Sequence, residues 1–372
     1  MRENNLQGKR RRKKHRRSEN SILAGSIILC IITLASVTVC LVTVFQNRAA
    51  QLQKVEVMRE LETARQEIEQ SYSQDEVDQM IQETVNQTKE QTSQEVSSEF
   101  LGKMREMMEA GEGATDMLRY FFTEEIVVAD AGRYYFFPIQ ENLKKHTYDP
   151  QGFQLDGDQI LHYYENGERV SHKGIDVSKY QDSINWKKVA DDEVEYAFIR
   201  LGIRGYTEGE ILVDDTFQEN IEGALDNDID VGVYFFTQAT SEAEAEEEAA
   251  FVIDSIERYD VTYPVVLDIE AVTNTNARAS DLTKEERTKY CITFCEKIKE
   301  AGYTPMIYGN LKTFMLMLDL EQLEEYDKWL AYYDEEMYFP YAFKIWQYTN
   351  RGNVSGIAGD VDLNISFEDL RN

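Results

Sequence analysis

The stretch that decides the fold is Tyr263-Pro264-Val265-Val266-Leu267-Asp268-Ile269-Glu270. Its apolar residues follow a proline and predict a strand that is buried on both faces, as in a parallel sheet. Because side chains alternate along a strand, Asp268 and Glu270 point to the same side, with Cα atoms roughly 6.6 Å apart. Neighbouring carboxyl groups push each other's pKa values apart, which suits general acid and base catalysis. For this pair alone, the alternative is that both acids leave the sheet into solvent or pair with a lysine.

Strand and helix signals alternate on both sides of this stretch. Further strands are expected at residues 174–177, 196–203, 231–236, 305–308, 328–333, 343–348 and 361–367. Helices are expected at residues 214–226, 241–259 and 284–301. Eight strands, with helices chiefly between the first five, predict an α/β fold. We expect an irregular (β/α) barrel over residues 173–372, closed or nearly closed by parallel strands.

The ends of the expected strands carry acids and aromatic residues. Chemistry in such barrels lies at the carboxyl ends of the strands. Asp176 ends the first strand and Asp362 begins the last, so these two acids join Asp268 and Glu270 as catalytic candidates. A ring of aromatic residues around acids is typical of a sugar-binding cleft, because sugar rings stack on aromatic faces and their hydroxyls bind carboxylates and amides. The expected substrate contacts are Tyr234, Tyr308, Tyr332, Trp346, Gln347 and Tyr348.

Several other chemistries are excluded by what the barrel lacks. All four histidines, the last of them His172, precede the barrel, which removes histidine-based triads and the usual zinc spacings. No phosphate-binding loop and no Asp-rich loop accompanies the acids, so we expect no metal and no cofactor. The net charge is −30, and the acids lie almost entirely after residue 47. Such an acidic chain excludes nucleic acid as a partner, because phosphates require basic contacts.

The amino-terminal region reads as a membrane anchor. Residues 1–20 hold a dense cluster of Lys and Arg, and residues 21–45 form an uncharged run rich in Ile, Leu, Val and Thr. That run is long enough to span a bilayer. The positive-inside rule makes residues 1–20 a cytoplasmic tail, with everything after the span outside the cell. We therefore expect a single-pass protein of the cell membrane; a secreted enzyme with a cleaved signal peptide is the alternative.

Two further segments separate the span from the barrel. Residues 48–112 are rich in Gln, Glu, Thr and Ser, and the spacing of Val57, Leu61, Ala64 and Ile68 resembles a coiled-coil seam. We expect a helical or coiled-coil stalk there, and whether it forms a homo-oligomer stays open. Residues 114–172 contain short strand patterns and an Asn-Gly pair at residues 166–167, a strong hairpin signal. This part is expected to be a small β-rich stem.

Several linked motifs along the barrel resemble a known family. They are Gly174-Ile-Asp176-Val-Ser-Lys-Tyr-Gln181 with Ile184-Asn-Trp186, Val266-Leu-Asp268-Ile-Glu270, Ile345-Trp-Gln-Tyr348 and Val361-Asp362-Leu-Asn364. Their order and spacing over residues 173–370 are similar to those of glycoside hydrolase family 25, the Chalaropsis-type lysozymes or N-acetylmuramidases. The resemblance implies an irregular α/β barrel that cleaves the β-1,4 bond between N-acetylmuramic acid and N-acetylglucosamine in peptidoglycan. It also implies that Asp176, Asp268, Glu270 and Asp362 lie in the active site.

Together these observations predict a membrane-anchored peptidoglycan hydrolase that acts on glycan strands. Glu270 is expected to be the general acid, and Asp268 is expected to stabilise positive charge at the sugar. Asp176 and Asp362 are expected to position the substrate and tune the pair. The alternative function is a non-catalytic, peptidoglycan-binding wall anchor or scaffold.

Overall fold

The computed structural model of the protein describes residues 57, 72–91, 94–272, 276–334 and 336–371. The predicted cytoplasmic tail (1–20) and transmembrane segment (21–45) lie outside the described residues, as do residues 48–56 and 58–71 of the predicted stalk. Within the described ranges, no helix is both long enough and apolar enough to cross a membrane. The chain divides into two compact units, Met1–Ser71 and Tyr72–Asn372, and the fold below is that of the second.

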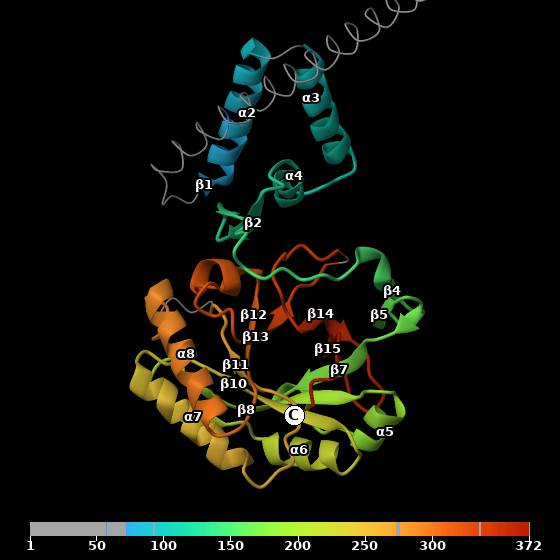
Figure 1. The fold of residues 1–372 in the computed structure, drawn as a ribbon, viewed down its shortest axis with the longest axis vertical. Helices are drawn as coiled ribbons and strands as arrows, with labels where there is room; N and C mark the ends of the chain where they lie inside the picture. The colour runs from blue at the N-terminus through green and yellow to red at the C-terminus, as the bar shows by residue number, and fades with distance from the viewer. Residues whose placement is uncertain (1–56, 58–71, 92–93, 273–275, 335, 372) are drawn as a thin grey trace, which may run out of the picture. The chain divides into compact units, whose positions relative to one another are not determined.

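In the described part of the chain, eight strands close into a barrel (Figure 1). They are β7 (His172–Val177), β8 (Tyr196–Arg204), β10 (Asp230–Phe236), β11 (Val265–Asp268), β12 (Pro305–Asn310), β13 (Asp327–Ala331), β14 (Ile345–Gly352) and β15 (Val361–Ser366). The barrel is closed because β8 pairs in parallel with both β7 and β10. A short strand, β9 (Ile211–Val213), pairs antiparallel with β8 outside the ring. The predicted α/β barrel is therefore confirmed.

The expectation of parallel strands is wrong for the last strand. β15 runs antiparallel to both of its neighbours, β14 and β7. The eight residues between β14 and β15 contain no helix, and only antiparallel strands can be joined by so short a connection. As a consequence, β15 begins at the edge of the barrel where the parallel strands end. Asp362, at the start of β15, therefore lies directly opposite Asp176 near the end of β7.

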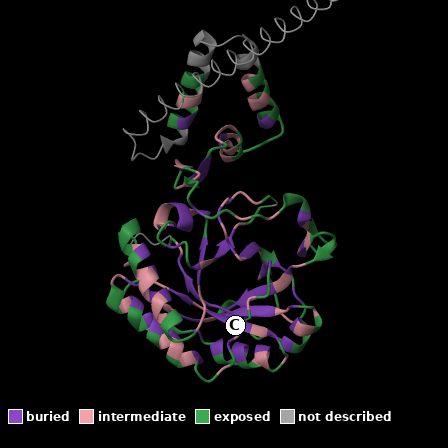
Figure 2. Cartoon of the chain, in the orientation of Figure 1, coloured by how far each residue is buried: buried purple, intermediate pink, exposed green. Residues whose placement is uncertain are grey.

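Four helices cover the outside of the barrel between its first five strands. They are α5 (Trp186–Asp191), α6 (Phe217–Leu225), α7 (Glu242–Ile256) and α8 (Lys284–Glu300). Their ends follow the expected signals. Ser241 Oγ accepts a hydrogen bond from Glu244 N at the start of α7, and Gly302 follows α8 with a φ of 92°. Figure 2 shows buried residues along the barrel strands and mixed burial on α7 and α8.

Strand alternation divides the core into an inner and an outer cluster. On β11, Val266 belongs to the inner cluster, together with large side chains such as Phe198 and Trp329. Val265 and Leu267 belong to the outer cluster, which packs under the helices. Asp268 follows Val266 at the next inward position and is buried. Alternation along the strand therefore points Val266 into the barrel interior and places Asp268 on the same side, at the carboxyl end of β11.

Residues 114–172, the stem, cover strands that have no helix over them. The stem contains α4 (Ala114–Phe121), β2 (Glu125–Asp130), β3 (Arg133–Pro138), η1 (Pro150–Gly152), β4 (Phe153–Leu155), β5 (Leu161–Glu165) and β6 (Glu168–Arg169). β5 and β6 pair across Asn166 and Gly167, both with positive φ, as the turn signal predicts. Aromatic rings of the stem pack on the outside of the barrel. The ring of Tyr148 stacks on that of Phe367, with centroids 3.8 Å apart, and the ring centroid of Phe153 lies 5.4 Å from that of Trp346.

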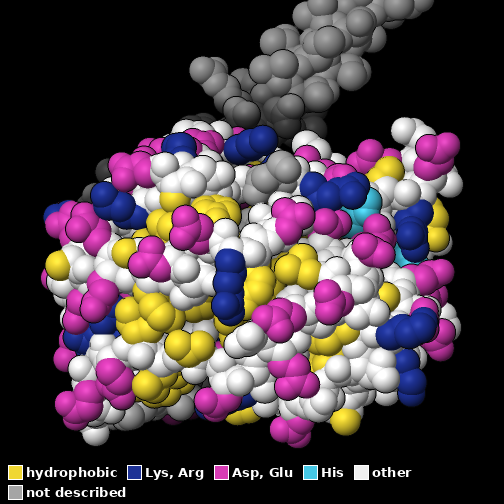
Figure 3. Space-filling model, turned by 90° about the horizontal axis from the view of Figure 1, so that it is seen from below, with side chains coloured by type: hydrophobic (Ala, Val, Ile, Leu, Met, Phe, Trp, Pro, Cys, Tyr) yellow, Lys and Arg dark blue, Asp and Glu magenta, His cyan; other side chains and the backbone are white. Residues whose placement is uncertain are grey.

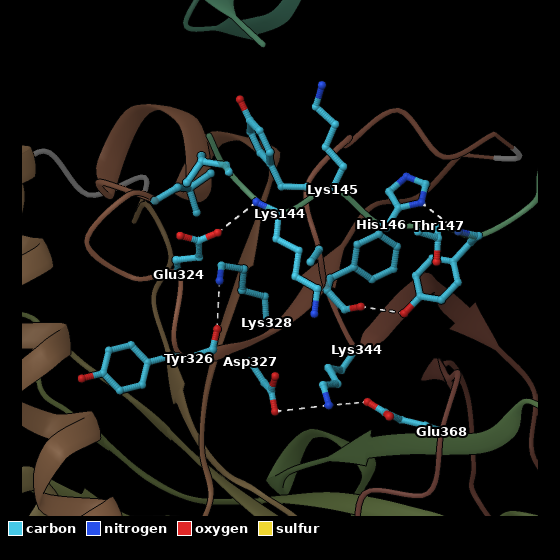
Figure 4. A pocket seen from close by; sticks show the side chains of 16 residues that line it. Lys144, Lys145, His146, Thr147, Glu324, Tyr326, Asp327, Lys328, Lys344 and Glu368 are labelled. Carbon is cyan, nitrogen blue, oxygen red and sulfur yellow. Dashed lines mark hydrogen bonds and ion pairs between the residues drawn. The ribbon is translucent and has the colours of Figure 1, made fainter. Parts of the chain in front are cut away.

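Residues 139–148 of the stem form a strap along the barrel (Figure 4). Ala342 N donates to Lys144 O at 2.8 Å, and Lys144 N donates to Glu324 Oε1 at 3.0 Å. Tyr148 OH donates to Phe343 O at 2.7 Å. A pocket of about 280 Å³ lies beside the strap, lined by lysines and acids such as Lys344, which pairs with Glu368. The strap is therefore bound to the outside of the barrel by hydrogen bonds.

The described part of the predicted stalk is not one extended helix. It consists of α2 (Gln74–Gln91) and α3 (Gln94–Glu109), preceded by the short strand β1 (Tyr72–Ser73), which pairs with β3. Val77, near the start of α2, is buried with Leu118 of α4, and Phe100 of α3 lies 4.4 Å from Phe121 of α4. Both helices therefore contact α4 of the stem. Of the residues proposed for the coiled-coil seam, only Val57 is described.

The barrel interior leaves no space for a side chain at Gly174, which gives a test of the closed ring. A Cβ atom there would lie 2.1 Å from the ring of Tyr196. We expect Gly174→Ala to lower the free energy of unfolding by about 1–3 kcal/mol, the usual cost of overpacking a core. Thermal and denaturant unfolding measure the change. Gly157→Ala is the control, because nothing lies within 4 Å of a Cβ at that position; equal stability of both variants would contradict the tight interior.

Candidate active site

The four predicted acids meet in one cleft at the mouth of the barrel. Asp176 comes from the end of β7, Asp268 ends β11, Glu270 follows two residues later, and Asp362 begins β15. All four line a cleft of about 650 Å³. On the face shown in Figure 3, Asp and Glu are spread over the surface with Lys and Arg between them.

Asp176 is held by two amide groups. It is buried, and its Oδ2 accepts hydrogen bonds from Gln347 Nε2 and Asn364 Nδ2, both at 2.8 Å. Burial raises the pKa of Asp176 to about 6, and the two hydrogen bonds oppose that rise. Without these two hydrogen bonds, the loss of water around the carboxyl would raise the pKa of Asp176 further. Gln347 and Asn364 therefore favour an ionised Asp176 inside the barrel.

Both amides are themselves oriented by aromatic donors. Trp329 Nε1 donates to Asn364 Oδ1 at 2.8 Å. Two hydroxyls donate to Gln347 Oε1, from Tyr308 at 2.8 Å and from Tyr333 at 2.6 Å. An amide has an acceptor and a donor end, so bonds to its oxygen turn its NH₂ group toward Asp176.

Asp268 is the most strongly desolvated acid of the site. It is 6% exposed, and its Oδ1 has no hydrogen-bond partner among the described residues. Burial raises the pKa of Asp268 well above its ordinary value, the charges of Glu270 and Asp176 raise it further, and Arg200 opposes the rise. A buried oxygen without a donor is a poor place for a full charge. The charged form of Asp268 is therefore disfavoured until a substrate supplies a donor.

Glu270 and Asp362 complete the group of acids. Burial raises the pKa of Glu270. Burial, followed by the charges of Asp176 and Glu270, raises the pKa of Asp362 to about 8. Because each ionised carboxyl disfavours the next, the four acids share protons and carry fewer than four charges at neutral pH. This arrangement can supply a proton donor and an ionised carboxylate in the same cleft.

The aromatic residues predicted to contact substrate divide by strand face. Tyr234, Tyr308 and Gln347 line the cleft. The structure places the other three outside it: Tyr332, Trp346 and Tyr348. On β14 the inward positions are 345 and 347, so Trp346 and Tyr348 necessarily point outward into the outer cluster. The prediction of substrate contacts by these three side chains is therefore corrected.

Several residues in and around the cleft are not among those predicted from the sequence. Tyr333, rather than Tyr332, faces inward after β13, and Asn364 lies two residues beyond Asp362 on the same face of β15. The period-two rule applied to these strands would have found both. Tyr180, in the short 3-10 helix Lys179–Gln181, and Tyr206, in a loop, are exposed at the rim, and neither segment has a periodic pattern. Arg200 also faces the cleft, where its Nε donates to Asp214 Oδ2 at 2.7 Å.

Metal binding is a separate question for this cluster of acids. Over residues 72–371, apart from the few positions that are not described, no group of three or more His, Cys, Asp or Glu is arranged to hold a metal ion.

The raised pKa of Asp268 predicts a gain in stability when its charge is removed. In the unfolded chain this acid ionises near its ordinary value, so above that pH folding must either take up a proton or bury a charge. Asp268→Asn avoids both, and we expect it to be more stable than the wild type at pH 8 by about 1–3 kcal/mol. The difference should shrink as the pH falls toward 4, because the carboxyl of the unfolded chain then approaches its ordinary pKa and takes up a proton as well.

Thermal unfolding between pH 4 and pH 8 measures this difference. Asp158→Asn is the control, because Asp158 is exposed on the stem. A stability gain that is the same at every pH, or equal in the control, would contradict a buried and desolvated Asp268.

Comparison with known proteins adds independent findings. The sequence model of "Glycosyl hydrolases family 25" matches residues 175–357. The chain is 32% identical over 202 residues to the uncharacterized protein YegX of Escherichia coli (strain K12), covering 52% of this chain and 68% of that protein. It is 28% identical over 205 residues to Lysozyme M1 of Streptomyces globisporus, covering 52% of this chain and 66% of that protein.

A solved structure of the modular autolysin LytC from Streptococcus pneumoniae, in complex with a synthetic peptidoglycan ligand, is also similar. It shares 25% sequence identity, with a TM-score of 0.49, over 65% of this chain and 58% of that chain. The family model covers three of the four acids of the cleft. Asp362 follows the last matched residue by five positions. On the sequence matches, the chain belongs to glycosyl hydrolase family 25.

Proposed function

We propose that this protein is a lysozyme (N-acetylmuramidase) that cleaves the β-1,4 bond between N-acetylmuramic acid and N-acetylglucosamine in peptidoglycan. The observation that carries the proposal is the meeting of Asp176, Asp268, Glu270 and Asp362 in one cleft. Glycoside hydrolysis commonly uses paired carboxyl groups, one as an acid and one as a carboxylate. Two relatives bear the name lysozyme, from Streptomyces globisporus and Clostridium acetobutylicum, which supports the same activity for this chain.

Glu270 is the general acid in this proposal. It lines the cleft and is partly exposed, so it can reach a substrate, and burial raises its pKa, which is the direction that a proton donor needs. A protonated carboxyl can transfer its proton to the glycosidic oxygen as the bond to the leaving sugar breaks. The positive charge that develops on the other sugar then requires a nearby oxygen atom.

Asp268 supplies that oxygen in our proposal. Its inward position on β11 is the one directly before Glu270, and its Oδ1 is free to accept a donor from the substrate. Asp268 therefore stabilises the positively charged sugar or a substrate group that assists it. Asp176 and Asp362 face each other across β7 and β15, where they position the substrate and adjust the proton affinity of the pair.

The general-acid role gives a direct test. Glu270→Gln keeps the size of the side chain and removes its acidic proton, so we expect activity on purified peptidoglycan to fall by about 10³-fold or more. New reducing ends and released muropeptides measure the activity, and unfolding measurements check that the variant folds. Glu208→Gln is the matched control, because Glu208 is exposed and lies outside the cleft.

The same assay separates catalysis from simple binding. A Glu270→Gln variant that cleaves peptidoglycan as fast as the wild type would overturn the general-acid assignment. Wild-type protein that binds peptidoglycan without forming reducing ends would favour a wall anchor or scaffold. The retention of all four acids in the cleft supports an enzyme over such a scaffold.

We further propose that residues 1–20 lie in the cytoplasm and residues 21–45 anchor the enzyme in the cell membrane with its barrel outside. The uncharged 25-residue run and the basic cluster before it support this arrangement. We expect the full chain to remain in the membrane fraction after a high-salt wash, and a variant lacking residues 1–47 to be soluble. Protease added to intact, wall-free cells should degrade the barrel.

Amino-terminal sequencing of the mature protein tests the secreted alternative. A mature chain that begins after residue 45 would contradict the anchor. Full-length protein in the soluble fraction would do so as well.

A further inference from the structure

The stem grips the segment of chain that leaves β13. Arg119, on stem helix α4, donates from Nη1 to the hydroxyl of Tyr332 at 3.0 Å. The same guanidinium lies 4.1 Å from the centre of the Tyr338 ring and 5.9 Å from that of Tyr332. A cation over an aromatic face is attracted by the negative charge density of the ring. One stem side chain thus binds two tyrosines of the connection between β13 and β14.

The stem backbone also binds the connection between β13 and β14, at the hydroxyl of Tyr338. Val127 N, on β2, donates to Tyr338 OH at 2.7 Å, and Tyr338 OH donates to Glu125 O at 3.2 Å. On the barrel side, Trp346 Nε1 donates to Tyr332 O at 2.6 Å. Tyr332 is therefore fixed at its hydroxyl by the stem and at its carbonyl by β14.

The residue next to Tyr332 belongs to the catalytic cleft. Strand alternation points Tyr333 to the opposite side, where its hydroxyl donates to Gln347 Oε1 at 2.6 Å. Gln347 Nε2 in turn donates to Asp176 Oδ2 at 2.8 Å. A continuous series of bonds therefore runs from a stem side chain outside the barrel to an acid inside it.

We propose that Arg119 is a positioning residue for the active site: by holding Tyr332 it fixes Tyr333, which turns the Gln347 amide toward Asp176. The family match begins at residue 175, so this contribution comes from a part of the chain outside the matched domain. The activity readout of the proposal rests on the proposed lysozyme function, whereas the geometry itself does not.

The series predicts a specific electrostatic effect at Asp176. Its two amide hydrogen bonds oppose the rise in pKa that burial causes. When Tyr333 is no longer held, Gln347 loses one of the two hydroxyls that orient it, and its bond to Asp176 weakens. The pKa of Asp176 should then rise, so activity that needs this carboxylate ionised should be lost at low pH and retained at high pH.

Other groups around Asp176 stay in place in the variants below. Tyr196 faces Asp176, and the titratable and charged groups that share its cleft are Lys179, Tyr180, Arg200, Tyr206, Asp214, Tyr234, Asp268, Glu270, Tyr308, Tyr333, Asp360 and Asp362. The variants alter only Tyr333 among these groups, and burial raises the pKa of Tyr333, so its hydroxyl stays neutral over the pH range of the test. A shift common to Arg119 and Tyr333 variants therefore reports the bonds between them.

The test is the pH dependence of kcat/KM on peptidoglycan, from pH 4 to pH 9, with the full-length chain. Arg119→Ala and Tyr333→Phe should each move the acid limb upward by roughly one pH unit, a loss of about tenfold at low pH. Arg119→Lys keeps a donor and a cation, and it should restore most of the wild-type profile. The double variant should show no more than the larger single effect, because both changes break one series.

The control is Asn142→Ala. Asn142 Nδ2 donates to Glu321 Oε1 at 2.8 Å, so this variant removes a stem-to-barrel bond that has no link to Tyr333. It should keep the wild-type pH profile. A ¹³C titration of the Asp176 carboxyl, assigned with Asp176→Asn, measures the same pKa shift without any turnover.

The outcomes are distinct. An Arg119→Ala variant that is less stable but keeps the wild-type pH profile would show a structural role alone and overturn the proposal. Additive shifts in the double variant would overturn it as well. If Arg119→Ala does not fold, Tyr332→Phe takes its place, because it removes the hydroxyl that Arg119 holds. Wild-type protein without glycan cleavage refutes the proposed function, and the ¹³C titration still decides the inference.

Discussion

Loss of water around the carboxyl groups at the barrel mouth is the constraint on which the rest of the site depends. Asp176 and Asp268 are both buried, and burial is the largest cause of the raised pKa at each of them. A carboxylate in such surroundings needs hydrogen-bond donors or an opposite charge. The amides of Gln347 and Asn364 supply donors to one acid, and Arg200 supplies a charge that favours ionisation of the other.

This constraint explains why tyrosine and tryptophan are concentrated inside the barrel. They fill its interior with apolar rings, and their polar atoms orient the amides that hold Asp176. A purely aliphatic interior would pack equally well but could not determine which end of an amide faces the acid. Packing and proton affinity are therefore set by the same side chains.

Much of the barrel could be predicted because strand periodicity is visible in the sequence. The alternation in residues 263–270 places Asp268 and Glu270 on one side, and the structure agrees. The direction of β15 could not be predicted in this way, because a buried strand has the same pattern in either orientation. Trp346 and Tyr348 differ from Gln347 because alternation along β14 points them to the outer cluster, although all three lie at the same strand end.

Loops and partner surfaces were the least predictable parts. Tyr180 and Tyr206 reach the cleft from segments with no periodicity, so only the closed barrel brings them together. The stem strands could be recognised, but a hydrophobic strand does not indicate which surface it will cover. That surface proved to be the outside of β14 and β15, where the barrel has no helices.

The stem also bears on how such enzymes are assembled in evolution. A domain that is self-contained can be moved between proteins by recombination at its borders. Here the border of the family match, at residue 175, passes between a barrel wall and the rings that shield it, Tyr148 and Phe153 on one side and Phe367 and Trp346 on the other. Recombination at that border would expose a wide aromatic surface to water and favour aggregation. In this chain the transferable unit is therefore larger than the family match, because it includes the aromatic layer that covers the barrel at Trp346 and Phe367.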